Sequence, residues 1–266
     1  MHYSKPITYY LIIALFSGFV FGQRITSENS PNRDSVKLSS EELIQLSQLV
    51  INEEEIPLDS DNGALDFFTL STITQQEYET GLTKAAQLII FDTTKVRKKN
   101  GVIQLICKNT TRKFVDYVPD ATDYAESIQT FEYIGQIPFL NVYVVLGIYW
   151  EWYEYKFIDK TTGEEIATFN ELPYISPDKK NILCISSNPY EMTADLSYYS
   201  LVGTKIRPIA SMCFSNWMAA DYSEHMYWGQ DGAFYVGINS IANFWDKTGD
   251  TNLPKQFIRF TRNNLK

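Results

Sequence analysis

Histidine and cysteine are scarce in this chain, and their scarcity excludes several classes of enzyme. The 266 residues include two histidines, one of them at position 2, so a mechanism or zinc site that needs paired histidines is excluded. The three cysteines, Cys107, Cys184 and Cys213, are too few for a disulfide-stapled scaffold, and one bridge with one buried thiol stays open. None of them has metal-ligand spacing, so we expect no metal ion and no cofactor.

Motifs of nucleophilic and phosphate chemistry are also missing. No serine stands in a Gly-x-Ser-x-Gly elbow, and no glycine-rich loop could cradle a phosphate. Cys213 and His225, with Asp221 between them, would permit a cysteine nucleophile. Because Met212 and Phe214 flank Cys213 as in a core strand, the sequence favours a buried thiol. We therefore assign no catalytic residue, and an enzyme is the less favoured reading.

Positive charge is in deficit. The chain has 32 acidic and 23 basic side chains, which gives a formal net charge of −9. A surface of this sign repels phosphate backbones and anionic lipid. Nucleic acid is therefore not an expected partner.

Long apolar runs are absent after the first residues. The uncharged run over residues 8–21 follows Lys5, and Val20, Phe21 and Gly22 offer a signal-peptidase pattern before Gln23. The run is shorter than the roughly 20 residues of a membrane span. We expect residues 1–22 to be a Sec signal peptide that sends the chain to the periplasm or beyond, with an uncleaved anchor as the alternative. No transmembrane segment is expected after cleavage.

Aromatic residues are abundant, with 18 Tyr, 16 Phe and 5 Trp, and they favour ordered β structure. Short runs rich in Val, Ile, Tyr and Phe predict strands at residues 101–109, 112–118, 130–136, 142–150 and 153–159. Gly163 predicts a hairpin turn over 160–165, and Asp231-Gly232 predicts a two-residue hairpin.

The residues before this β region predict helices. Ser39 with Glu42, and Thr74 with Glu77, form capping boxes before apolar residues at helical spacing, which predicts helices over 40–54 and 74–85. The expected organisation is a signal peptide (1–22), a flexible linker (23–38), a helical N-terminal segment (39–100) and a β domain (101–266). The predicted fold class is mainly β: an antiparallel meander with propeller-like four-strand units after a short α-helical segment.

A weak internal repeat supports that fold. Residues 153–169 lead into 172–186, residues 195–210 lead into 226–238, and 254–262 restart the pattern. Within it, Ser176-Pro177-Asp178 resembles the Ser-Pro-Asp-Gly-Lys signature of WD40-like and TolB-like β-propeller blades. Residues 130–262 are similar to uncharacterised secreted bacterial proteins with such blades. The resemblance implies a scaffold without a defined activity.

The sequence departs from that family in two ways. Lys179 and Lys180 stand where the blade signature continues with Gly-Lys, and about three units are visible, whereas a closed propeller normally has four or more. Either the 101–118 hairpin completes a small propeller, or the units form an open curved sheet.

Two aromatic stretches are candidate ligand or partner surfaces. The first is the tip between two predicted strands, with Tyr149, Trp150, Trp152 and Tyr153; the second is the 217–228 insertion, with Trp217 and Trp228. The leading hypothesis is a non-catalytic binding module for an unknown envelope protein or glycan.

Two other hypotheses stay open. A carboxylate-dependent hydrolase of envelope polysaccharide would use some of Glu151, Glu154, Asp178 and Asp221 as acid and base, and it needs two of them in one cleft. A purely structural accessory domain predicts that neither aromatic stretch is exposed.

Overall fold

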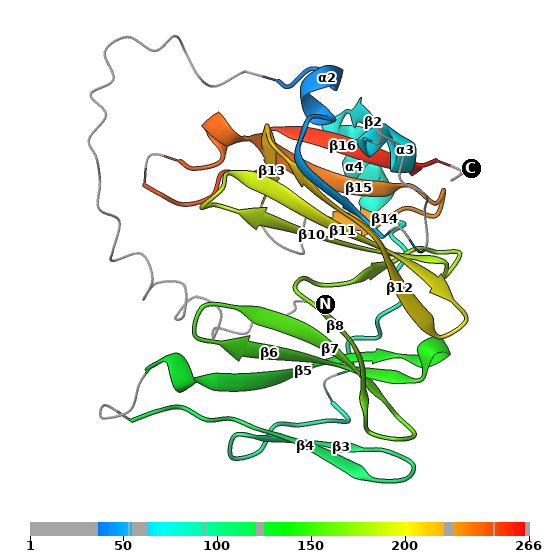
Figure 1. Cartoon of the computed structure of the whole chain (residues 1–266), viewed down its shortest axis with the longest axis vertical. Coiled ribbons are helices and arrows are strands. Elements are labelled where there is room, and N and C mark those ends of the chain that lie inside the picture. Colours follow the sequence, from blue (N-terminus) through cyan, green and yellow to red (C-terminus); the bar gives the residue numbers. More distant parts are fainter. Residues whose placement is uncertain are drawn as a thin grey trace. The chain divides into compact units, whose positions relative to one another are not determined.

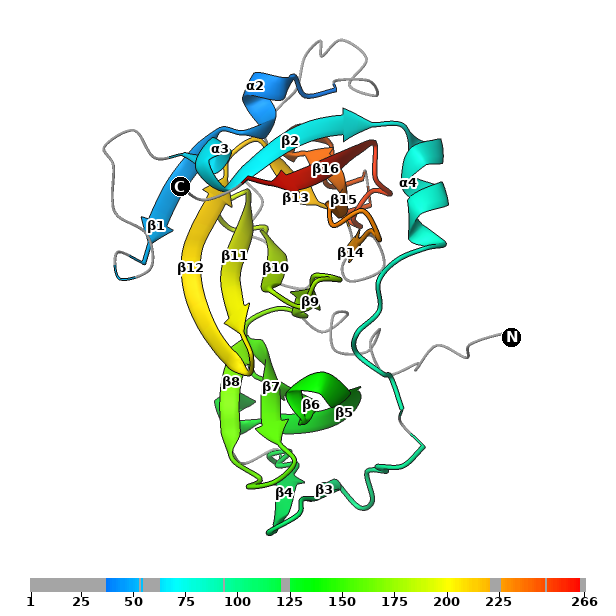
Figure 2. The same ribbon diagram turned by 90° about the vertical axis from the view of Figure 1, so that its right-hand side faces the viewer.

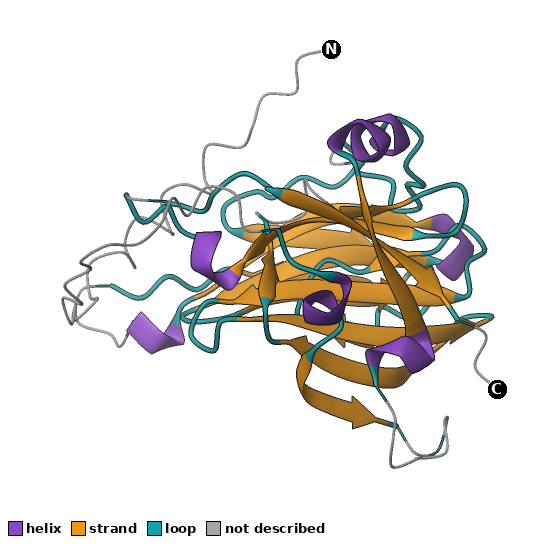
Figure 3. Ribbon diagram, turned by 90° about the horizontal axis from the view of Figure 1, so that it is seen from above, coloured by secondary structure: helices purple, strands orange, loops and turns teal. Residues whose placement is uncertain are grey.

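Antiparallel sheets hold most of the described chain (Figure 1). The computed structural model describes residues 37–52, 54, 63–92, 94–120, 125–220, 226–246 and 248–263, and these belong to one compact unit that begins at Val36. The mainly β, antiparallel fold with few helices is confirmed, and Figure 3 shows how far strands outnumber helices. The predicted signal peptide and nearly all of the predicted linker lie outside the described residues.

The first sheet is a four-strand meander preceded by a separate hairpin. The hairpin consists of β3 (Val102–Ile106) and β4 (Thr111–Val115). The meander runs in the order β5 (Gln129–Ile137), β6 (Val142–Tyr149), β7 (Tyr153–Asp159) and β8 (Glu165–Phe169). Short 3-10 helices, η1 (Ala125–Ser127) and η2 (Pro138–Leu140), flank β5. The five strands predicted between residues 101 and 159 are confirmed as β3 to β7, to within a few residues. Gly163, in the predicted turn, has a positive φ of 74°.

The second sheet repeats the meander and gains a strand from the N-terminal region. Its order is β1-β12-β11-β10-β9, with β9 (Tyr174–Ile175), β10 (Asn181–Asn188), β11 (Thr193–Val202), β12 (Lys205–Phe214) and β1 (Leu46–Ile51). The third sheet has the order β13-β15-β16-β2, with β14 also paired to β15. Its strands are β13 (Trp217–Ala219), β14 (Met226–Trp228), β15 (Phe234–Ser240), β16 (Gln256–Arg262) and β2 (Phe68–Ile73). In Figure 2, β2 lies along β16.

Each pair of neighbouring sheets shares its own apolar cluster. The β3–β4 hairpin and the first sheet bury Ile103, Leu105, Phe114, Phe131, Val145 and Ile158 together. The first and second sheets bury Val144, Phe157, Phe169, Ile182, Cys184 and Leu201. The second and third sheets bury Leu183, Ile185, Phe214, Trp217, Phe234 and Phe260. Alternate residues of β10 therefore enter two different cores, as the two-residue period of a strand requires.

The helix predicted over residues 40–54 is wrong beyond its first turn. The capping box of Ser39 and Glu42 is present, but α2 spans only Ser40–Leu43, and residues 46–51 form β1 on the edge of β12. Pairing with the open edge of β12 outweighs a weak local helical preference. The second helix is confirmed as α4 (Gln75–Leu82), and a short α3 (Ala64–Phe67) precedes β2.

The repeat and the turns are reproduced in part. Residues 153–169 form β7 and β8 of the first sheet, and residues 172–186 begin the second sheet with β9 and most of β10. The Asp231-Gly232 turn is longer than predicted, because β14 ends at Trp228 and β15 begins at Phe234. In the described part of the chain, the sheets do not close into a propeller.

Candidate functional site

The hairpin tip between β6 and β7 carries an ordered aromatic pair. The backbone N–H of Tyr149 donates to the carbonyl of Trp152, 2.8 Å away, which closes the turn. The two rings stack with centroids 4.0 Å apart and planes 15° from parallel. Trp152 is 54% exposed and Trp150 38% exposed, so two indoles stand at one end of the first sheet.

A polar network under the tip fixes the position of Tyr149. Its hydroxyl donates to Glu154 Oε1 at 2.7 Å, and the same oxygen lies 2.5 Å from Lys156 Nζ. Lys156 also contacts Glu165 Oε2 at 3.0 Å. Burial lowers the pKa of Lys156, but its hydrogen bonds to the two carboxylates outweigh burial and raise it. The ammonium therefore stays charged, and Glu154 keeps its partner.

The tyrosine ring also needs space on the strand. Any Cβ at Gly147 would lie 2.8 Å from the Tyr149 hydroxyl oxygen, so only glycine lets the ring lie across β6 and reach Glu154 on β7. Phe131 meets the same ring edge-on at 6.3 Å. Phe131 packs against the Tyr149 ring, Gly147 leaves room for it, and Glu154 accepts its hydroxyl. Trp152 stacks on this fixed ring.

The other predicted aromatic stretch is not a surface. Trp217 is fully buried, its indole N–H donates to the Leu43 carbonyl at 3.0 Å, and its ring lies 4.7 Å from that of Phe214. Trp228 is 2% exposed and donates to the Tyr174 carbonyl at 2.9 Å. The prediction that these two indoles face a partner is wrong, because their N–H groups find acceptors in the interior.

The carboxylates of the hydrolase hypothesis have structural partners or lie apart. Glu154 belongs to the network under the tip, whereas Glu151 is exposed on the turn itself. Asp178 lies in the turn before β10 and contacts a different sheet. Asp221 and His225 lie outside the described residues. Neither of the two depressions described on the molecule is lined by Glu151, Glu154 or Asp178.

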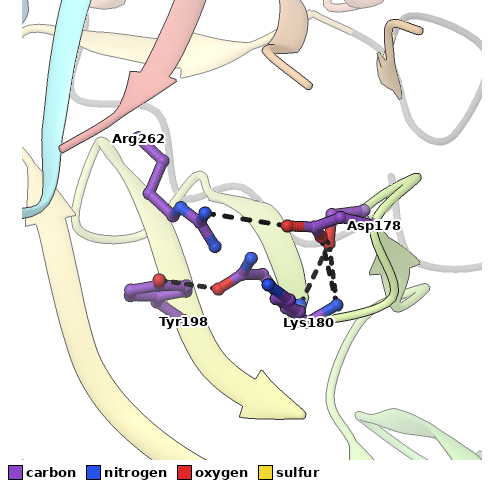
Figure 4. Close-up of polar contacts among 6 residues, drawn as sticks. Asp178, Lys180, Tyr198 and Arg262 are labelled. Carbon is purple, nitrogen blue, oxygen red and sulfur yellow. Dashed lines mark hydrogen bonds and ion pairs between the residues drawn. The ribbon is translucent and has the colours of Figure 1, made fainter. Parts of the chain in front are cut away.

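The Ser-Pro-Asp turn is built as its residues suggest (Figure 4). Asp178 Oδ1 accepts from the Ser176 hydroxyl at 2.5 Å and from the Lys180 backbone N–H at 3.1 Å. Its other oxygen lies 3.6 Å from Arg262 of β16, so the turn also connects to the third sheet. Burial raises the pKa of Asp178, but these hydrogen bonds and Arg262 prevail and lower it. The Asp178 carboxylate thus satisfies polar groups of its own turn.

A buried hydrogen bond between Tyr198 of β11 and Asn181 of β10 lies next to this turn. The Tyr198 hydroxyl donates to Asn181 Oδ1 at 2.8 Å, and both side chains are buried. Lys179, between Asp178 and Lys180, has φ +59°, the left-handed conformation that glycine adopts without strain. The turn thus carries a lysine in a backbone conformation that glycine adopts without strain.

One acidic residue that the sequence did not reveal is Glu171, in the loop between β8 and β9. Tyr153, on β7, donates its hydroxyl to Glu171 Oε1 at 2.5 Å. Burial raises the pKa of Glu171 to about 7, although the Tyr153 hydrogen bond lowers it. No local pattern around Asn170 and Leu172 signals an acid with a raised pKa, since its neighbours Tyr153 and Cys184 come from strands of two different sheets.

The three cysteines are free thiols. Cys107 and Cys184 are buried, and Cys213 is half-buried with its sulfur 3.8 Å from Gln48 Oε1. Burial, followed by the charge of Asp195, raises the pKa of Cys213 to about 11. A thiol that stays protonated is a poor nucleophile.

The described residues contain no helix long and apolar enough to cross a membrane, and they bring together no group of three His, Cys, Asp or Glu suited to a metal ion. Searches of protein families, curated proteins and solved structures found no match for the chain. The site must therefore be interpreted from its own geometry.

The positive φ of Lys179 predicts a difference between two truncations. Lys179→Gly and Lys179→Ala both remove the ammonium and its contact with the Phe139 ring, but only alanine keeps the left-handed strain. We expect the glycine variant to be more stable than the alanine variant by roughly 1 kcal/mol. Urea unfolding of both purified variants measures the difference, and equal midpoints with equal slopes would contradict it.

Glu171 predicts a pH dependence of stability. Its pKa is about 7 in the folded chain against an ordinary 4.5, so the folded state binds more protons between these values. Stability is therefore highest below about pH 4.5 with respect to this group, and it falls as pH rises through 7. Relative to Glu171→Gln, the wild type should lose about 2 kcal/mol of unfolding free energy between pH 5 and pH 8. Parallel pH profiles of the two proteins would show that Glu171 titrates normally.

Proposed function

We propose that this chain is an exported, non-catalytic binding module, and that the β6–β7 tip, defined by Tyr149, Trp150, Trp152 and Tyr153, contacts its partner. The partner is a protein or a glycan of the cell envelope or exterior. The export part of the proposal rests on the apolar run over residues 8–21 and the cleavage pattern that follows it.

One observation carries the binding part: an exposed tryptophan stacks on a tyrosine that a buried ion pair holds in place. A free surface indole loses side-chain freedom when it binds, and that loss weakens binding. At this tip the freedom is already removed by the stack and by the fixed tyrosine beneath it. Large rigid aromatics with a polar edge are the side chains that dominate binding energy in interfaces.

The network beneath the tip supports a binding role over a catalytic one. Glu154 is shared between the Tyr149 hydroxyl and the Lys156 ammonium, so its oxygen is committed to positioning the ring. A general acid or base must instead reach the bond that reacts. Tyr153 is likewise committed, through its hydroxyl, to Glu171.

Removing the two exposed indoles should abolish partner binding without unfolding the chain. The purified chain over residues 23–266 and its Trp150→Ala/Trp152→Ala variant serve as bait for an envelope extract of the native host and for a glycan array. We expect the variant to lose at least tenfold in retention of the partner, because exposed aromatic anchors contribute about 2 kcal/mol or more each.

Two further variants make this test specific. Trp245→Ala removes an indole that is also partly exposed but lies outside the tip, and it should bind as the wild type does. Tyr149→Phe keeps the ring stack but removes the hydrogen bond to Glu154, and it should bind with intermediate affinity. If the double variant, confirmed as folded by circular dichroism, retains the same partner equally well, the tip is not the binding surface.

A further inference from the structure

A surface depression lies beside the hairpin that joins β11 and β12, and no residue of the aromatic tip lines it. Its volume is about 570 Å³, and its lining includes Phe139, Lys179, Lys180, Leu201, Val202 and Thr204. We call it the β11–β12 groove. Its volume is within the roughly 300–1,000 Å³ range of small-ligand sites, which is enough for a few residues of an extended peptide.

The floor of the groove is apolar and one of its apolar side chains is uncovered. Leu201 is buried in the core shared by the first and second sheets, whereas Val202, the next residue, is 62% exposed. The backbone N–H of Leu201 donates to the Lys180 carbonyl at 2.7 Å, so the lysine turn and the hairpin are joined directly. An occupant with an aliphatic or aromatic side chain would cover Val202 and gain from that burial.

The rim of the groove is positive although the whole chain is acidic. Lys179 and Lys180 are adjacent and exposed, and within the described residues neither ammonium has an ion-pair partner within 4.0 Å. The nearest carboxylate of the turn, Asp178, is already bound by Ser176, the Lys180 backbone and Arg262. The positive charge of the rim therefore comes from Lys179 and Lys180.

The lysine at the rim is kept at a conformational cost. Lys179 has φ +59°, where a side chain is disfavoured and glycine is not, and its Nζ lies 4.8 Å from the centroid of the Phe139 ring. Backbone strain of this kind persists where the surrounding structure enforces it, and it concentrates at binding sites. Lys179 thus combines a strained backbone with an ammonium that lies over an aromatic ring at the edge of the groove.

From these four features we infer that the β11–β12 groove binds an acidic peptide segment of a partner, with an apolar side chain next to its carboxylates. The carboxylates meet Lys179 and Lys180, and the apolar side chain covers Val202, the exposed apolar residue of the groove. A sugar is less suited to this groove, because Lys179 lies over the Phe139 ring that would stack on it. An anionic bilayer is disfavoured by the formal net charge of −9. This site is independent of the β6–β7 tip.

The test uses the full chain and two pools of fluorescent hexapeptides. Every member of the first pool carries two Asp or Glu and two Leu, Ile, Val or Phe; the second pool replaces the acids with Asn and Gln. Retention of each pool is measured on immobilised wild type, Lys179→Gly, Lys180→Gln and the control Lys113→Gln, which removes an exposed lysine of β4. A sulfated oligosaccharide and vesicles of anionic lipid are run alongside.

We expect the wild type and Lys113→Gln to retain the acidic pool at least tenfold over the neutral pool. Each groove variant should lose about tenfold of that retention, as the loss of one charge-assisted contact implies. The Lys179→Gly variant separates function from folding, because it relieves backbone strain while it removes the cation. Equal retention of the two pools overturns the inference. So does acidic-pool retention that survives both groove substitutions, or binding of only the oligosaccharide or the vesicles at these lysines.

Discussion

The strand β10 is the element on which the arrangement of the sheets depends. Ile182 and Cys184 face the core shared with the first sheet, and Leu183 and Ile185 face the core shared with the third. A strand that is apolar on both faces has no polar side to set its register. Its eight pairs with β11 and the hydrogen-bonded Ser-Pro-Asp turn before it take that role. The turn is thus a structural part of the fold as well as the rim of the β11–β12 groove.

The ion pair beneath the aromatic tip likewise has two structural roles. An isolated buried ion pair often adds little to stability, because both charges lose water. Here the Glu154–Lys156 pair has a second role, since the carboxylate also receives the Tyr149 hydroxyl. The pair therefore also fixes the position of the ring that supports Trp152.

Local patterns in the sequence predicted the parts of this fold that depend on neighbours along the chain. Residues a few positions apart determine the strands of the first meander, the capping boxes before α2 and α4, and the Gly163 turn. Long-range pairing decided the rest. Residues 46–51 became a strand because β12 offered a free edge, and Trp217 was buried because Leu43 offered its indole an acceptor. The raised pKa of Glu171 belongs to the same group, because its neighbours Tyr153 and Cys184 lie far from it in the sequence or on another sheet.

The outer strand of the third sheet comes from near the beginning of the described chain, and its partner comes from near the end. β2 pairs with β16, and the hydrogen bond from Thr69 to Asn263 joins residues 194 positions apart. During synthesis, β2 therefore exists long before the strand that covers it, and its edge stays open to any other extended segment meanwhile. Closing a loop of this length is slow compared with forming the meanders. The third sheet is therefore complete only after β16 has been made, and without β16 one edge of β15 and one edge of β2 are unpaired.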